Sequence, residues 1–184
     1  MRSLPTALLS LSVVLGLLVG CSGIQVDRDY DPEVDFGSLR TWAWISHSGK
    51  SDDPRIDNAL LDSRVRGAVE RKLAELGYQK LESGDPDFGV VYHAAINKEI
   101  RVDTIYRSHG YRRYGYGGVG YAETVVSEYD VGSLIIDLVD PSGQKLLWRG
   151  IASAAIQPGD KPEKRTKRVG QAVDKIFKRF PPGQ

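Results

Sequence analysis

The feature that most constrains the fold is the one-sided apolar pattern of two segments, which predicts two amphipathic helices. Between residues 56 and 76, apolar side chains recur at three- and four-residue spacing, and the positions between them are largely charged. The segment 160–180 shows the same pattern near the C-terminus. Each helix must bury its apolar stripe, and the strand-like segments between the two helices are the only partner available.

The expected ends of the helices come from capping residues. Asp53 followed by Pro54 predicts the start of the first helix, with Asp as the N-cap and Pro at the first helical position. Gly77 predicts its end, because glycine readily adopts the left-handed conformation that closes a helix. We expect the second helix to begin at residues 160–162 and to stop at the Pro181–Pro182 pair.

Alternation of apolar and polar residues predicts strands in the rest of the chain. The segments with this pattern are 24–30, 41–45, 78–81, 88–105, 123–129, 133–140 and 144–156. Residues 141–143 (Pro-Ser-Gly) predict a hairpin turn with Asp140 opposite Gln144. That register places one apolar set on a common face: Leu134, Ile136, Leu138, Leu146 and Trp148.

Together these elements predict a single α+β domain over residues 21–184. We expect a mainly antiparallel sheet of roughly five to seven strands, with both helices packed on one face and a partly polar opposite face.

The first residues indicate export and lipid attachment. One positive charge, Arg2, precedes an uncharged apolar stretch that ends in Leu18-Val19-Gly20-Cys21. This matches the bacterial lipobox, and Cys21 is the only cysteine of the chain. We therefore expect residues 1–20 to be removed as a signal peptide and Cys21 to carry a diacylglycerol, since that alkylation requires a sulfur nucleophile. The alternative is a plain signal peptide or signal anchor with an incidental cysteine.

The residue after Cys21 and the charge balance bear on location and partners. Ser22, rather than Asp, favours retention at the periplasmic side of the outer membrane in a Gram-negative host. The expected partner is thus the membrane, through the acyl chains on Cys21. Beyond Arg2 the chain has 24 basic and 24 acidic residues, and this neutral balance argues against a nucleic-acid partner.

A succession of short motifs along the chain resembles a known family. The motifs are Asp29-Tyr30-Asp31, Phe36, Thr41-Trp42-Ala43-Trp44, Gly77-Tyr78, Asp85-Pro86-Asp87-Phe88, the strand-like segment from Leu134 to Asp140, Leu147-Trp148-Arg149-Gly150 and the C-terminal Ile176-Phe177 with Phe180-Pro181-Pro182. In this order they resemble the bacterial lipoprotein family known as domain of unknown function 4136. The resemblance implies an envelope lipoprotein with an α+β domain, and it brings no catalytic residues.

A glycine- and tyrosine-rich segment, residues 108–121, is the candidate binding element. Its partner-binding residues would be Tyr111, Arg112, Arg113, Tyr114 and Tyr116. Tyrosine rings and guanidinium groups suit the surface of an envelope protein or a glycan. The alternative is a hairpin tip that the arginines merely keep soluble.

Other candidate chemistry is sparse. The histidines, His47, His93 and His109, show no ligand spacing, so we expect no metal and no cofactor, and we interpret His93 as an ordinary strand residue. The aspartates at 27, 29, 31, 35, 85 and 87 flank turns, where they cap the local backbone. We therefore expect a non-catalytic binding or envelope-integrity protein. The alternative is a periplasmic hydrolase of an envelope glycan or lipid, which would need Asp, Glu or His side chains converging in a cleft.

Overall fold

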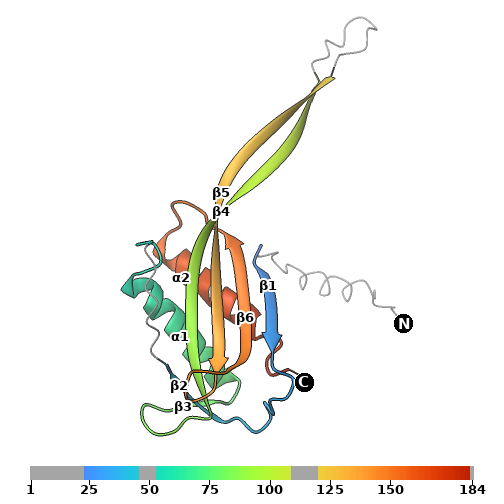
Figure 1. Cartoon of the computed structure of the whole chain (residues 1–184). Helices are drawn as coiled ribbons and strands as arrows, with labels where there is room; N and C mark the ends of the chain where they lie inside the picture. The colour runs from blue at the N-terminus through green and yellow to red at the C-terminus, as the bar shows by residue number, and fades with distance from the viewer. Residues whose placement is uncertain (1–22, 46–52, 109–119, 183–184) are drawn as a thin grey trace, which may run out of the picture.

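The computed structural model describes residues 23–45, 53–108 and 120–182. Figure 1 shows a single sheet with two helices packed side by side on one of its faces. The fold class predicted from the sequence, one α+β domain with a mainly antiparallel sheet, is confirmed. The proposed signal peptide and Cys21 lie outside the described residues.

The sheet has six strands in the order β1-β6-β5-β4-β2-β3. Their bounds are β1 Gln25–Tyr30, β2 Thr41–Trp44, β3 Gln79–Lys80, β4 Phe88–Ser108, β5 Gly120–Val139 and β6 Leu146–Ala155. The pairs β1–β6, β6–β5 and β5–β4 are antiparallel, and β2 runs parallel to both β4 and β3. The helices are α1 (Ala59–Glu75) and α2 (Pro162–Phe177).

Aromatic rings dominate the core between the sheet and the helices. Trp148 of β6 is fully buried and stacks on Phe177 of α2, with ring centroids 5.4 Å apart. Phe180 packs edge-on against the same indole at 5.1 Å. From α1, Val69 and Leu73 are fully buried in the same cluster. The two predicted apolar stripes therefore share one partner, the helix-facing side of the sheet.

The predicted start of α1 is wrong by several residues. The helix begins at Ala59, and its N-cap is Asn58, whose side-chain oxygen accepts a hydrogen bond from the Leu61 N–H at 2.9 Å. Asp53 instead accepts hydrogen bonds from the backbone and guanidinium of Arg55. The Asp-Pro pair thus starts a turn before the helix. The predicted end is confirmed, because Gly77 has φ +87° just after the C-cap.

The predicted register of the 141–143 hairpin is also wrong. Gly143 adopts the expected left-handed conformation, with φ +74°. However, Trp148 pairs with Leu138, and Leu146 pairs with Val139 across an irregularity in the ladder. Asp140 causes the shift, since its carboxylate accepts the N–H groups of residues 144 and 145 and widens the loop. Leu146 is consequently exposed instead of joining the predicted apolar cluster.

Strands β4 and β5 form a long two-stranded arm (Figure 1). Their pairing runs without a break from Gly89 opposite Val139 to Ser108 opposite Gly120. The separate strands predicted at 123–129 and 133–140 are therefore one strand, and the expected kink at Gly132 is absent from the pairing. Strand β6 covers β5 only as far as Val131, so beyond that point the arm strands pair with each other alone.

Neither helix of the described part of the chain has the length and apolar character that a membrane-spanning helix needs.

The close approach of α2 to β6 gives a testable prediction. A Cβ at Gly150 would collide with Trp148 and Ile176, both of which are locked in the core. Gly150→Ala should therefore lower the free energy of unfolding by about 1–3 kcal/mol. The matched control is Gly67→Ala on α1, where a Cβ meets nothing within 4 Å. Removing a helix-interior glycine there should raise stability by about 0.5–1 kcal/mol. Urea unfolding measures both, and equal effects at the two sites would contradict the packing described.

Candidate functional site

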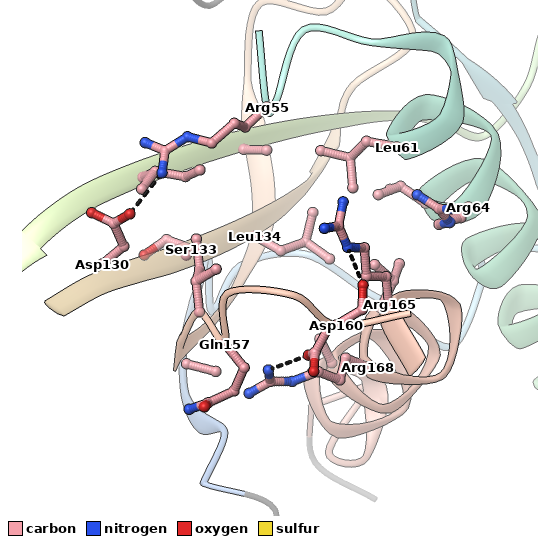
Figure 2. Close-up of a pocket in the computed structure, with 18 of the residues that line it drawn as sticks. Arg55, Leu61, Arg64, Asp130, Ser133, Leu134, Gln157, Asp160, Arg165 and Arg168 are labelled. Carbon is pink, nitrogen blue, oxygen red and sulfur yellow. Dashed lines mark hydrogen bonds and ion pairs between the residues drawn. The ribbon is translucent and has the colours of Figure 1, made fainter. Parts of the chain in front are cut away.

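One cavity lies between the helix-facing side of the sheet and the first turns of both helices. Its volume is about 680 Å³, within the range of about 300–1,000 Å³ that is usual for small-molecule sites. Residues of β4, β5 and β6 form one wall, and Leu61 of α1 and Val169 of α2 face them. Figure 2 shows arginine side chains around its edge. We call this cavity the arginine pocket.

The pocket exists because the side chains on the helix-facing side of the sheet become small toward the end of the sheet that lies under the first turns of the helices. Near the middle of the sheet, one row of paired residues is Val90, Leu138 and Trp148, all fully buried. Four and six positions further along the same face, the rows are Ala94-Leu134-Ala152 and Ile96-Gly132-Ala154. The alanines and glycine are too small to reach the helices above them, so a hollow remains.

Four arginines and two aspartates are the charged residues among those lining the pocket: Arg55, Arg64, Arg165, Arg168, Asp130 and Asp160. Two of the arginines are neutralised. Arg55 contacts Asp130 at 2.6 Å and Asp53 at 2.7 Å, and Arg168 contacts Asp160 at 3.0 Å. The lining as a whole therefore carries an excess of two positive charges.

Arg64 and Arg165 have no carboxylate partner within the part of the chain that the structure describes. The Nε of Arg64 donates to the hydroxyl of Thr166 at 3.0 Å, which links α1 to α2. The Nε of Arg165 donates to the backbone carbonyl of Asp160 at 3.0 Å. Each guanidinium is thus oriented by one hydrogen bond and keeps its terminal nitrogens for another acceptor.

The N-terminus of α2 lies at the same edge, where Pro162 lines the pocket. Its N-cap is Lys161, which makes no side-chain capping hydrogen bond, and the next residue is Pro162. The first N–H groups of the helix are therefore not satisfied by a capping side chain. By contrast, Asn58 is the N-cap of α1, and its side chain does accept a hydrogen bond from the first turn of that helix.

Asp160 organises the start of α2. Its carboxylate contacts Lys164 at 2.7 Å and Arg168 at 3.0 Å. The hydrogen bond from Lys164, assisted by the one from Arg168, lowers the pKa of Asp160 below its ordinary value. Asp160 is therefore ionised near neutral pH and is a poor proton donor.

The lowered pKa of Asp160 predicts an acid-dependent stability. The ionised form is favoured in the folded state, so its stabilising effect is present above the ordinary Asp pKa of 3.8 and is lost as pH falls through the lower folded value. Asp160→Asn should lower Tm at pH 7, and the difference from wild type should shrink as pH falls below 3.8. Thermal melts across this range test it, with Asp174→Asn on the exposed side of α2 as the control. A difference independent of pH would contradict the prediction.

The structure does not describe the binding residues predicted from the sequence. Five residues fall outside the described part of the chain, in the segment between the end of β4 and the start of β5: Tyr111, Arg112, Arg113, Tyr114 and Tyr116. The expectation that this segment joins two antiparallel strands is confirmed. Their partner-binding role stays a prediction, as does lipidation of Cys21.

His93 lies on the helix-free face of the sheet, as an ordinary strand residue. Its neighbour Tyr92 points to α1 and donates to Asp62 at 2.8 Å, so His93 points the opposite way. There His93 Nε2 is 3.5 Å from Asp137, which also accepts two hydrogen bonds from Arg149. Among the described residues, no group of three His, Cys, Asp or Glu side chains has the geometry to hold a metal ion.

Several predicted aspartate caps are confirmed. Asp31 and Asp35 each accept the backbone N–H two residues on, and Asp87 accepts those of Arg40 and Thr41. The hydrogen bond from Lys145, together with the one from the Glu33 N–H, lowers the pKa of Asp31, and the hydrogen bonds from the Thr41 and Arg40 N–H groups lower the pKa of Asp87. These carboxylates therefore serve local backbone structure.

The arginine pocket was not predicted from the sequence. Its basic residues belong to helices in which most charged positions face solvent, so nothing in the spacing distinguishes Arg64 or Arg165. The one available signal was the run of small residues Ala152 to Ala155 in β6, where a core strand would be expected to carry larger side chains.

The family model for Domain of unknown function (DUF4136) matches residues 26–182. The chain belongs to this family. A comparison with curated proteins finds no match.

Among solved structures, a PDZ domain protein from Parabacteroides distasonis is 14% identical with a TM-score of 0.54. The match covers 88% of this chain but only 37% of that one, and it indicates a shared fold. A PelC dodecamer from Paraburkholderia phytofirmans is 11% identical with a TM-score of 0.42, covering 88% of this chain and 99% of that one.

Proposed function

We propose that this DUF4136 protein is a lipid-anchored periplasmic lipoprotein of the outer membrane that binds a ligand without converting it chemically. The observation that carries the binding role is the arginine pocket, a preformed hollow with an apolar floor and oriented polar groups at its edge. The lipobox at Cys21 supports the anchoring.

The position of the pocket fits such an anchor. Ile24, the residue before β1, lines the pocket, and it follows Cys21 by three residues. Three residues of extended chain span roughly 10 Å. An acylated Cys21 would therefore hold the pocket close to the membrane surface, where apolar and amphiphilic ligands are concentrated.

The alternative, a periplasmic hydrolase, is less well supported by the pocket chemistry. General acid catalysis needs a carboxyl group whose pKa is raised toward the working pH. The pKa of Asp160 is instead lowered, and Asp130 contacts Arg55 at 2.6 Å. Both pocket carboxylates are thus engaged by cations, which favours binding over acid–base chemistry.

Anchoring is tested by Cys21→Ser. The substitution removes the only thiol, so lipidation should be lost and uncleaved precursor should accumulate. Metabolic labelling with a palmitate analogue measures this, with Ser22→Ala as the matched control that keeps the thiol. Unchanged labelling of Cys21→Ser would overturn the proposed anchoring.

Ligand binding is tested by filling the pocket. Among the described residues, every member of the buried core lies between Phe36 and Phe180, so a chain that begins at Ser22 keeps this whole core without the lipid. This domain should raise the fluorescence of N-phenyl-1-naphthylamine, a neutral apolar probe. Ala154→Trp should reduce the signal at least fivefold, because the indole occupies the floor of the pocket.

The control for this experiment is Ala122→Trp, which places the same indole on an exposed part of the arm. It should leave probe binding unchanged, and circular dichroism checks that both variants fold. Equal binding by wild type and Ala154→Trp would rule out the pocket as the ligand site.

A further inference from the structure

We infer that the arginine pocket takes an amphiphile with one acyl chain and a terminal carboxylate, the class of the long-chain fatty acids. This inference rests on the proposed binding function and specifies its ligand. Three properties of the pocket lead to it: its size, its apolar surface, and two lining arginines, Arg64 and Arg165, without a carboxylate partner among the described residues.

The size favours a single chain. One water molecule takes up about 30 Å³ in the liquid, and a CH₂ group is of similar size. A cavity of about 680 Å³ therefore holds roughly 20 non-hydrogen atoms with their hydrogens. A fatty acid of common length has about this number, whereas a diacyl phospholipid has more than twice as many. The pocket therefore matches one acyl chain with a compact head group.

The apolar surface extends from the floor to the opening. Leu61, Leu134 and Val169 line the interior beside the small residues of the sheet. Leu60, in the first turn of α1, also lines the pocket yet is 67% exposed. A leucine this exposed beside an apolar hollow gives a chain a continuous apolar surface from the opening inward.

The charged groups identify the head group. Arg64 belongs to α1 and Arg165 to α2, and both side chains line the pocket. Among the residues that the structure describes, neither arginine has a carboxylate partner. The first turn of α2, without a capping side chain, lies at the same edge. A carboxylate there would accept hydrogen bonds from the guanidinium nitrogens of both arginines and would offset half of the excess positive charge of the lining.

The experiment compares two ligands that differ only in the head group. Binding of cis-parinaric acid to the unlipidated domain is followed by fluorescence, and oleate and oleyl alcohol are used as competitors. Oleate should compete at least tenfold better than oleyl alcohol. In the double variant Arg64→Gln, Arg165→Gln this preference should fall to less than threefold, because oleate loses its charged partners and the alcohol loses little.

The control is Arg71→Gln, which removes an arginine of α1 that does not line the pocket. It should keep the tenfold preference for oleate, and thermal melts confirm that each variant is folded. Loss of the preference in Arg71→Gln as well would show a general charge effect and overturn the inference.

The possible failures separate the two proposals. Equal competition by oleate and oleyl alcohol, or a preference for dioleoyl phosphatidylglycerol over oleate, would overturn the fatty-acid inference while leaving a pocket that binds apolar ligands. If neither cis-parinaric acid nor the neutral naphthylamine probe bound, the proposed binding function would fall with it.

Discussion

The contact of α2 with Trp148 is the interaction on which the core and the pocket both depend. Phe177 and Phe180 hold the indole at the C-terminal end of α2, and Gly150 lets Ile176 approach the strand beside it. This fixes one end of the helix tightly on the sheet. The other end then lies above alanine and glycine positions that cannot fill the space, so tight packing at one end leaves a hollow at the other.

The same arrangement gathers the charges. The first turns of α1 and α2 both lie at the pocket, and the hydrogen bond from Arg64 to Thr166 ties the two helices together there. Arg55 and Arg168 are used in ion pairs that fix the surrounding loops, whereas Arg64 and Arg165 remain available to an acceptor. An apolar hollow with two available guanidinium groups is suited to an amphiphile, and the proposed anchor at Cys21 would place it at a membrane surface.

The sequence predicted the architecture because periodicity reports burial directly. The apolar stripes of α1 and α2 and the alternation in β4 and β6 were sufficient for the fold class, and the chain's motifs for the family. The errors arose where one side chain overrides a general pattern. Asn58 caps α1 in place of Asp53, and the Asp140 carboxylate holds a wider loop than the turn residues alone suggest. The pocket could not be predicted, because Arg64 and Arg165 come to the same cavity only through the packing of two helices that lie far apart in the chain.

The most direct test of this account is a crystal structure of the unlipidated domain with oleate bound. We predict an acyl chain lying over Ala94, Gly132 and Ala154, with the carboxylate within hydrogen-bond distance of Arg64 and Arg165. Oleate bound outside the pocket, or bound in it with the carboxylate directed away from both arginines, would contradict the account.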